Sequence, residues 1–255
     1  MLNILFPSLP YQRLVDPMWA EEMDTARHYG HTVGLFDAEQ EKLHQAPNPN
    51  YPSLYRGWML TGAEYQKLEA LTPLLVPLAM YLASHWANGW YQAIAGFTPK
   101  SYFIPVEERS AILTLLRSHG RCFVKGLSKS FGTDSVVSSL AEYDHLLKKH
   151  AVDSAEALFV REFVKLSAAP EQRFFAVRGR VYGASGQPFP AELAPVLLAL
   201  QSRWFYTIDV AYDLHGKPII IEVGDGQVSD TKEWTVSALY ENVVNLVAAV
   251  QEPER

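Results

Sequence analysis

The sequence is poor in cysteine and has no long apolar run. Its single cysteine, Cys122, excludes a disulfide within the chain, and its apolar neighbours in RCFVK favour a role in core packing. The longest apolar run, residues 74–83, contains Pro77 and is much shorter than the about 20 residues that a membrane-spanning helix needs. We therefore expect neither a disulfide nor a transmembrane segment.

Basic residues are also scarce. The 255 residues include 22 Lys and Arg against 28 Asp and Glu, a formal net charge of −6, and the basic residues form no run. This argues against sequence-independent binding of nucleic acid or of an anionic membrane, although a local basic cleft for phosphates stays open. The opening segment MLNILFPSLP lacks a basic region before its short apolar run, so we expect a first strand, no signal peptide and a cytoplasmic protein.

Several familiar cofactor and catalytic motifs are missing. The segment after the first expected strand, PSLPYQR, lacks the G-x-G-x-x-G pattern, and neither G-x-x-x-x-G-K-[ST] nor G-x-S-x-G occurs in the chain. The eight histidines include no H-E-x-x-H spacing. These absences disfavour a Rossmann cofactor site, a P-loop, an α/β-hydrolase and a zinc hydrolase.

The pattern that is present predicts a mixed α/β protein. Hydrophobic residues make up 48% of the chain, enough for one large domain or two small ones. A strand over 2–7, a helix over 19–29 and a strand over 31–37 predict a parallel sheet that binds ligands at the carboxyl ends of its strands. Another strand is expected in YRGWML. The first unit is then expected to end near residues 99–105.

The second half of the chain predicts two helices and then a series of strands. A helix over 107–118, a strand over 121–127 and a helix over 138–150 come first, and HGK at 215–217 joins the last two strands as a hairpin. The later strands are expected over 157–166, 173–177, 180–183, 205–212 and 218–223, with one helix over 191–202. A final amphipathic helix carries its apolar side chains at Val236, Leu239, Tyr240, Val243, Val247 and Val250.

Two lysines flank a loop of small residues in FVKGLSKSFG. Lys125 ends an apolar strand, and Lys129 follows in a loop where Ser and Gly allow backbone N–H groups to approach an anion closely. This arrangement suits a polyphosphate. The alternative is a solvated surface loop whose lysines bind nothing.

Two further segments offer contacts to a nucleotide. In LFVREFVKL, the strand offers backbone groups to the edge of a base, and Glu162 is placed to accept a hydrogen bond from a hydroxyl. In EQRFFAVRGR, Arg173 opens a strand, where a rigidly held guanidinium makes a good phosphate clamp. Taken alone, each residue is more typical of the exposed face or end of a strand.

Two carboxylates lie in strands that are otherwise apolar. Asp209 lies within FYTIDVAY and Glu222 at the end of IIIE in the hairpin partner, a pairing that brings such positions together on one face. Buried carboxylates without a cation are costly, because desolvation and like charge oppose ionisation. A magnesium ion removes that cost, so the pair, facing two lysines and an arginine, predicts a Mg-nucleotide site. The alternative is two unrelated surface carboxylates.

The order of these segments resembles the ATP-grasp superfamily, and in particular its clade named for one arginine and two lysines. VKGLSKS matches a V-K-x-x-x-K-S pattern, LFVREFV matches the hinge, and IIIEVGDGQVS matches the final segment. The segments ILFPS, AEEMDTARHYGHTVGLFD and YRGWM resemble the domain that precedes ATP-grasp in that clade. The resemblance implies an α/β (α+β) ATP-grasp fold. Residues 1–104 would form a Rossmann-like preATP-grasp domain and residues 105–255 the nucleotide- and metal-binding region.

The resemblance also implies roles for individual residues. The nucleotide ligands that it implies are Lys125, Lys129, Ser130, Glu162, Phe163, Val164 and Arg173, of which Lys125, Lys129 and Arg173 are also the catalytic candidates. Asp209 and Glu222 become the Mg2+ ligands. Many members of the family have asparagine where this chain has Gly224, so Asp225 is expected to supply that oxygen. Arg56 in YRGW is expected to hold a substrate carboxylate, with packing on an aromatic ring as the alternative.

Members of the superfamily use ATP to phosphorylate a carboxylate, and an amine or another nucleophile then displaces the phosphate. Such transfer depends mostly on positioning and charge neutralisation. We therefore expect a Mg-ATP-dependent carboxylate-amine ligase with ATP and Mg2+ as cofactors and a small molecule or peptide as substrate. Two alternatives stay open: an inactive ATP-binding regulatory or interaction protein, and an ATP-dependent phosphotransferase.

Overall fold

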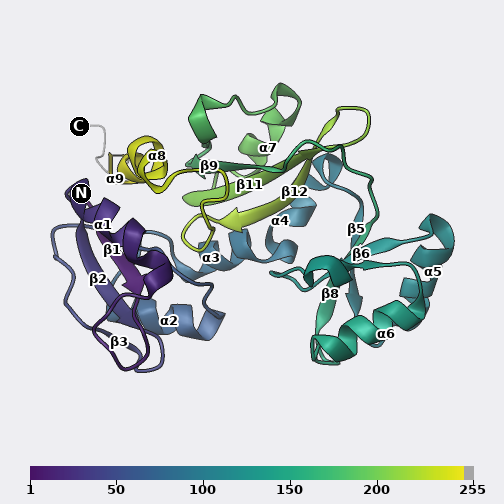
Figure 1. The fold of residues 1–255 in the computed structure, drawn as a ribbon, viewed down its shortest axis with the longest axis horizontal. Helices are drawn as coiled ribbons and strands as arrows, with labels where there is room; N and C mark the ends of the chain where they lie inside the picture. The colour runs from purple at the N-terminus through teal and green to yellow at the C-terminus, as the bar shows by residue number, and fades with distance from the viewer. Residues whose placement is uncertain (250–255) are drawn as a thin grey trace.

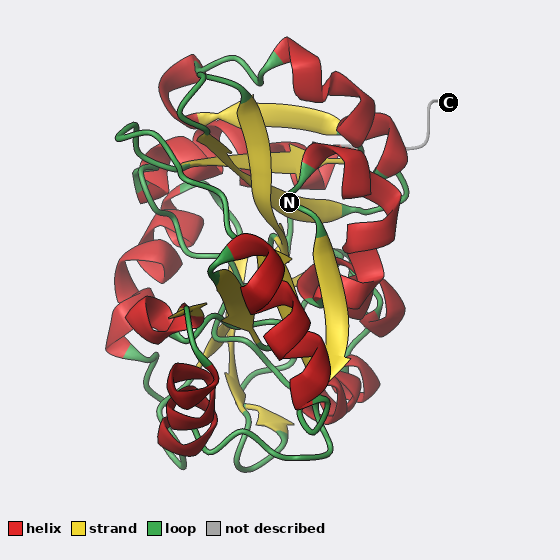
Figure 2. Ribbon diagram, turned by 90° about the vertical axis from the view of Figure 1, so that its right-hand side faces the viewer, coloured by secondary structure: helices red, strands yellow, loops and turns green. Residues whose placement is uncertain are grey.

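The computed structural model describes residues 1–249 of the chain. Within these residues the strands form three four-stranded sheets (Figure 1). In the side view of Figure 2, strands run through the interior and helices flank them. Val250, expected to be the last apolar residue of the C-terminal helix, lies outside the described residues.

The first sheet has the order β3-β2-β1-β4 and contains the predicted parallel pair. Its strands are β1 (Asn3–Pro7), β2 (Thr32–Asp37), β3 (Lys42–Leu43) and β4 (Ser53–Tyr55), and β1 is parallel to both β2 and β4. Helix α1 (Ala20–His28) connects β1 to β2, as the opening pattern predicts. The strand predicted in YRGWML is wrong, because β4 ends at Tyr55. The chain turns there, and a Cβ at Gly57 would lie 2.3 Å from the Tyr55 hydroxyl.

Three helices lead from the first sheet to the rest of the molecule: α2 (Gly62–Leu71), α3 (Leu78–His85) and α4 (Ala87–Ile94). Thr61 and Glu64 cap the start of α2 reciprocally, which satisfies two free backbone N–H groups. Helices α3 and α4 meet at a sharp corner, where a Cβ at Gly89 would lie 2.5 Å from the Ala83 carbonyl oxygen. The corner therefore requires glycine.

The second sheet is antiparallel and has the order β5-β8-β6-β7. Its strands are β5 (Ser101–Pro105), β6 (Cys122–Lys125), β7 (Val136–Val137) and β8 (Ala157–Glu162). Helices α5 (Arg109–His119) and α6 (Leu140–Lys149) share one apolar core with it, and Cys122 is buried there. Strand β5 was not predicted, and the expected domain boundary at residues 104 and 105 falls inside it. Strand β8 ends at Glu162, four residues before its predicted end.

The third sheet is also antiparallel, with the order β10-β9-β11-β12. Its strands are β9 (Gln172–Val177), β10 (Arg180–Gly183), β11 (Phe205–Tyr212) and β12 (Pro218–Asp225). The predicted β11–β12 hairpin is confirmed. One face of this sheet packs against α4 and against α7 (Ala194–Ala199), a helix shorter than predicted. The charged side chains described below lie on the other face.

The C-terminal segment returns to the first sheet. It comprises α8 (Val236–Leu239), a π-helical turn (Tyr240–Val244) and α9 (Asn245–Ala249), and Figure 1 shows it beside α1. Leu239, Tyr240 and Val243 are buried in the same core as residues of β1 and β4. Both ends of the described chain thus stabilise one core. No helix within residues 1–249 combines the length and the apolar character that crossing a membrane requires.

Candidate active site

A row of charged side chains crosses the face of the third sheet that lies opposite α4 and α7. Farther along this face, Phe175, Val177 and Phe205 pack into the core shared with the first sheet. Asp209 on β11 pairs in register with Arg173 on β9 and with Glu222 on β12, so the three side chains share one face. Arg173 donates two hydrogen bonds to Asp209, from Nε to Oδ1 over 2.8 Å and from Nη2 to Oδ2 over 2.7 Å. The sequence prediction that Arg173, Asp209 and Glu222 come together therefore agrees with the geometry.

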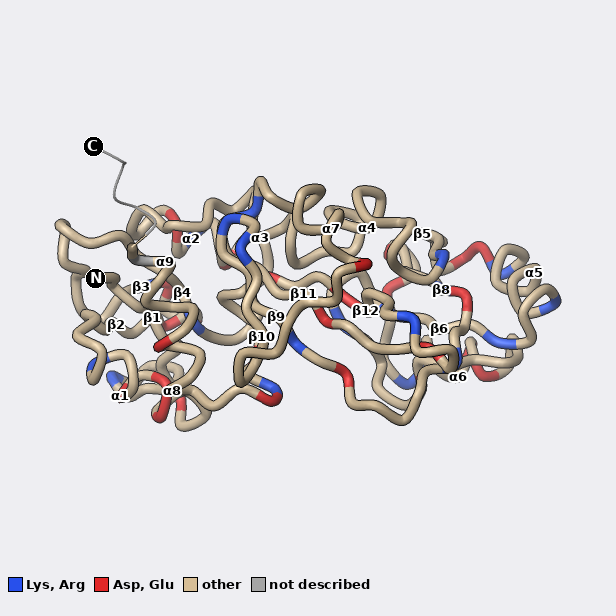
Figure 3. Tube along the Cα trace, turned by 90° about the horizontal axis from the view of Figure 1, so that it is seen from above, with Lys and Arg blue, Asp and Glu red and all other residues tan. Residues whose placement is uncertain are grey.

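The second sheet extends this row. Lys125, at the end of β6, is buried and forms an ion pair with Glu222. Figure 3 shows basic and acidic positions side by side in this middle part of the molecule. Lys129 and Ser130 lie in the following loop, which Gly126 closes with a hydrogen bond to the Lys129 carbonyl oxygen, and both side chains are exposed. The two sheets thus meet at a pair of opposite charges.

Lys232 is a member of this row that sequence reasoning missed. Its Nζ lies 2.8 Å from Asp209 Oδ2 and also contacts Glu171, and its backbone has a φ of +44° in the left-handed region. The loop after β12 is fastened to β9, because Glu233 accepts from the Arg173 backbone N–H and Trp234 donates to the Arg173 carbonyl oxygen. The motif DTKEW shows a polar loop but no sign that its lysine reaches back to β11.

Charge compensation keeps Asp209 ionised. Burial opposes ionisation of Asp209, but the hydrogen bonds and charges of Arg173 and Lys232 outweigh it and hold the pKa of this carboxyl below its usual value. Burial raises the pKa of Glu171, and the nearby Asp209 charge adds to the effect. Burial and the charges of Lys125 and Lys129 lower the pKa of His85 to about 4. His85 is therefore neutral at physiological pH.

A cavity of about 390 Å³ opens beside the charged row, between the second and third sheets. The expected hinge residues Glu162, Phe163 and Val164 line it, and so does Glu171, the partner of Lys232. The remaining lining residues are mostly apolar: Pro99, Phe123, Val136, Arg161, Leu166, Ile219 and Ile221. An apolar cavity with Arg161 in its wall and the charged row next to it suits a base with its phosphates.

The side chain of Glu162 does not have the predicted orientation. It accepts a hydrogen bond from the Tyr102 hydroxyl over 2.9 Å and lies 3.4 Å from His119 Nε2 of α5, on the helix-covered face of the second sheet. Successive residues of a strand point to opposite faces. Arg161 therefore faces the third sheet, where its Nη1 donates to the Ile221 carbonyl oxygen.

Asp225 is placed away from the carboxylates with which it was grouped. It lies three residues beyond Glu222, on the opposite face of β12, and is fully buried with Gln227 donating to its Oδ1. Burial raises its pKa to about 7.

Within residues 1–249 no group of three or more His, Cys, Asp or Glu side chains is arranged to hold a metal ion. The structure thus leaves Asp209 and Glu222 as the candidate pair, without Asp225.

The backbone at Gly224 explains why asparagine is absent there. A Cβ at this position would lie 2.7 Å from Thr207 Oγ1, closer than real Cβ atoms approach another atom, and 3.0 Å from Ser229 Oγ. Thr207 and Ser229 are hydrogen-bonded to each other over 2.9 Å. Their hydroxyls fill the space that a side chain at 224 would take.

Arg56 does not reach the charged row. It is completely buried, its Nε and Nη2 donate to both oxygens of Glu22 over 2.6 and 3.0 Å, and its Nη1 donates to the carbonyl oxygens of Gly226 and Ser229. Each nitrogen of its guanidinium already donates inside the protein, and none is exposed to a substrate carboxylate. The predicted substrate role is therefore replaced by a structural one, in which Arg56 ties the loop after β12 to α1.

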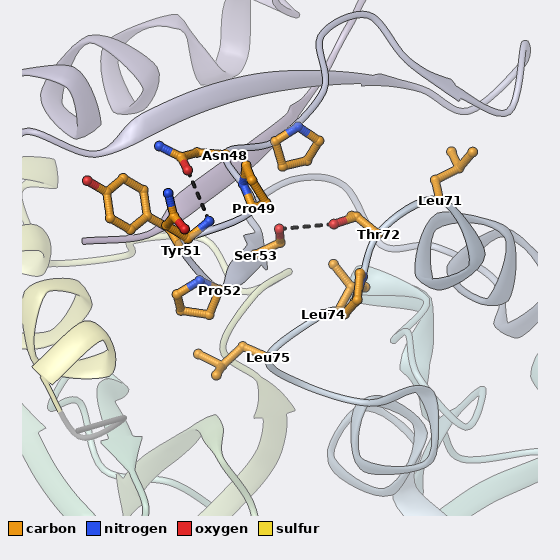
Figure 4. A pocket seen from close by; sticks show the side chains of 12 residues that line it. Asn48, Pro49, Tyr51, Pro52, Ser53, Leu71, Thr72, Leu74 and Leu75 are labelled. Atoms are coloured by element: carbon orange, nitrogen blue, oxygen red, sulfur yellow. Dashed lines mark hydrogen bonds between the residues drawn. The ribbon is translucent and has the colours of Figure 1, made fainter. Parts of the chain in front are cut away.

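A larger cavity, of about 640 Å³, lies at the edge of the first sheet (Figure 4). It is lined by residues 47–53 and 71–75, none of which carries a charge. Ser53 and Thr72 are hydrogen-bonded to each other on its wall over 3.2 Å. Despite its greater volume, this cavity offers no cation for a phosphate, whereas the cavity between the second and third sheets has Arg161 in its wall and is the better candidate for a nucleotide.

Comparison with known proteins identifies the family. A family model of the ATP-grasp domain, for family 3 of the clade named for one arginine and two lysines, matches residues 37–243, so the chain belongs to this family. The expected superfamily and clade are thus confirmed. No curated protein has a sequence that matches the chain.

Solved structures show the same fold at low sequence identity. D-cycloserine synthetase DcsG is 13% identical with a TM-score of 0.67, covering 96% of this chain and 99% of its own. A RimK domain ATP-grasp protein from Sphaerobacter thermophilus DSM 20745 is 15% identical with a TM-score of 0.65 and 98% coverage of both chains. ATP-grasp ligase PsnB, solved with a minimal precursor, Mg and ADP, is 10% identical with a TM-score of 0.59, covering 96% of this chain and 97% of its own. The chain therefore has the α+β ATP-grasp fold.

Proposed function

We propose that this chain is a Mg-ATP-dependent ligase that activates a carboxylate as an acylphosphate for attack by an amine or another nucleophile. The observation that carries this proposal is the charged row itself. Arg173, Asp209 and Glu222 lie side by side on one sheet, and Glu222 meets Lys125 of the other sheet. The row reaches an apolar cavity through Glu171, which lines the cavity and pairs with Lys232. Ion pairs that served only to stabilise the fold would not have to lie next to a cavity.

In this proposal the cavity binds adenine and ribose, with the backbone of residues 162–164 as the hinge. Lys125, Lys129, Ser130 and Arg173 bind the phosphates, and Asp209 and Glu222 bind magnesium. The two carboxylates fit magnesium because they face each other across one strand pair, and magnesium takes its remaining ligands from water and substrate phosphates. Bound magnesium would neutralise phosphate charge and orient the terminal phosphoryl group.

The charged residues of the row form ion pairs with one another, and a bound ligand can replace these partners. Lys125 holds Glu222, while Arg173 and Lys232 hold Asp209. Phosphate oxygens can replace the carboxylates as partners of Lys125 and Arg173, and the carboxylates then become free for magnesium. The cations stay in place to stabilise the charge that develops during transfer to the substrate carboxylate.

Similar proteins support this reaction class. The solved structures include a D-alanyl-alanine synthetase from Vibrio cholerae and a macrocyclase, MdnC, bound with its precursor peptide. A small molecule or a peptide is accordingly the substrate class that we propose. The finding that Arg56 is sealed in the core leaves the substrate carboxylate without its expected ligand.

A nucleotide-binding protein without turnover is the second candidate. Two features favour it: Gly224 cannot carry a third metal ligand without displacing Thr207 or Ser229, and residues 1–249 contain no cluster of three metal-binding side chains. An ATP-dependent phosphotransferase would differ from both in releasing a stable phosphorylated product. Release of ADP that depends on an added acceptor supports the ligase over the other two.

The direct test is the thermal stabilisation of the wild type and of Glu222→Gln by ATP, with and without magnesium. The wild type is expected to be stabilised most by Mg-ATP, because ligands that bind only the folded state raise its stability. Glu222→Gln removes a metal ligand, so magnesium should add little to the effect of ATP on this variant. If the variant responds to Mg-ATP as the wild type does, the metal assignment is wrong.

A further inference from the structure

Arg161 on β8 is a buried cation without a carboxylate partner in the described part of the chain. Only 6% of the residue is exposed. Its Nη1 donates to the Ile221 carbonyl oxygen over 2.8 Å and its Nε reaches Ser101 Oγ over 3.4 Å, but its Nη2 is buried with no hydrogen-bond partner among residues 1–249. Burying a charge with an unused donor is costly. A third partner is therefore missing.

The electrostatics agree with this geometry. Burial lowers the pKa of Arg161 to about 10, against the opposing effect of Glu222, so the side chain stays charged at physiological pH. Its guanidinium lies over the ring of Phe159 at 5.2 Å, which holds it in one orientation. A rigid, charged and incompletely satisfied donor is a typical preorganised ligand contact.

Arg161 also lies in the wall of the cavity that we propose to bind the nucleotide. It lines the 390 Å³ cavity together with Phe123, its register partner on β6, and with Ile221, the neighbour of Glu222. The guanidinium thus lies in the wall of the cavity and is hydrogen-bonded to the strand that carries Glu222. A nucleotide bound in the cavity would lie against this side chain.

Arg203 provides an internal contrast. It has the same exposure, 6%, and its Nε has no hydrogen-bond partner within residues 1–249. Its Nη2, however, donates to the carbonyl oxygens of Ala83 and Gly89 and so closes the corner between α3 and α4. Arg203 lines none of the cavities described above, so its role is structural.

We propose that Arg161 is a nucleotide-binding residue whose free N–H donates to an acceptor atom of the bound nucleotide, either a ring nitrogen of the base or an α-phosphate oxygen. The inference rests on the proposed function, since it requires a nucleotide in this cavity. It assigns a donating contact to the strand residue before the hinge, whereas Glu162 was expected to accept from a hydroxyl. Donors of a guanidinium match acceptors only, so the bound atom must be unprotonated nitrogen or oxygen.

Calorimetric titration of the full chain with Mg-ADP and with adenosine tests this role in Arg161→Met, with Arg203→Met as the matched control. Arg161→Met should weaken Mg-ADP binding about tenfold or more, the effect of losing a charged hydrogen bond. Arg203→Met should bind within about twofold of the wild type, because it removes a buried arginine outside the cavity. Melting of each variant in the absence of ligand shows that it is folded.

The two ligands distinguish the two acceptors. If adenosine and Mg-ADP weaken alike, Arg161 contacts the base; if only Mg-ADP weakens, it contacts the phosphate, and either result supports the proposal. A folded Arg161→Met that binds Mg-ADP as tightly as Arg203→Met overturns it. Should Arg161→Met not fold, Arg161→Lys keeps the charge but loses the forked donor, and wild-type affinity in that variant is equally contradictory. A wild type that binds no Mg-ADP contradicts the proposed function instead.

Discussion

Two clusters of buried opposite charges hold this molecule together, and they differ in what surrounds them. In the first, Arg56 and Glu22 have side-chain exposures of 0% and 5%, and all three nitrogens of the Arg56 guanidinium donate inside the protein. In the second, Glu222 and Lys232 are 32% and 28% exposed, and Asp209 is shared by two cations. A sealed and saturated pair serves structure, whereas a shared and accessible one can exchange partners with a ligand.

The largest effect is expected from breaking the sealed pair. Arg56→Met leaves the Glu22 carboxylate buried with only the Tyr240 hydroxyl, a change that should lower the free energy of unfolding by about 3–5 kcal/mol. Denaturant unfolding measures this loss. Nucleotide affinity of the molecules that remain folded should be unchanged. A loss below about 1 kcal/mol, or a selective loss of nucleotide binding, would remove the distinction between the two clusters.

The second-largest effect is expected from a change in the charged row, where a ligand can replace the internal ion pairs. Asp209→Asn should reduce ADP formation at least about a hundredfold, because it would remove a proposed metal ligand at the transferred phosphate. Arg173 and Lys232 keep Asp230 and Glu171 as partners, so stability should fall less than in Arg56→Met. Asp213→Asn, in the turn of the same hairpin, serves as the control for activity. Equal rates in both variants would contradict the assignment of Asp209.

The smallest expected effect is a pH dependence of the free energy of unfolding, and it arises from Asp225, outside the charged row. The pKa of Asp225 is raised by burial to about 7 from an ordinary value near 4, so the folded state holds its proton at pH values where the unfolded chain has lost it. The free energy of unfolding should therefore fall as the pH rises from about 4 to about 7, by at most about 1.4 kcal/mol per pH unit. Urea unfolding across this range should show a flatter profile for Asp225→Asn. An unchanged profile would mean that Asp225 titrates normally.

The fold could be predicted where the spacing of apolar residues indicates a strand and where the residues of a turn indicate how two strands are joined. The HGK turn and its apolar flanks fix the register of β11 and β12, so the meeting of Asp209 and Glu222 followed from local sequence. Strand β5 was missed because Ser101–Pro105 is short and ends in proline, and its pairing with β8 is a long-range contact. The family resemblance was equally visible, since it rested on the order of several motifs.

The site was predictable only in part, because burial and side-chain direction depend on distant segments. Arg56 looked available until α1 placed Glu22 against it. Asp225 was grouped with Glu222 by proximity in sequence, although their odd spacing places them on opposite faces of β12. The same alternation could have favoured Arg161 over Glu162. No local pattern indicated Lys232, whose contact with Asp209 depends on the path of the loop after β12.

The central claim is that magnesium and nucleotide together replace the internal ion pairs of the row. Calorimetric titration of the wild type with ADP in the presence and absence of magnesium tests this claim most directly. We predict that ADP binds at least about tenfold more tightly with magnesium, because the metal takes the carboxylates as the phosphates take the cations. An ADP affinity that is the same with and without magnesium would contradict the account.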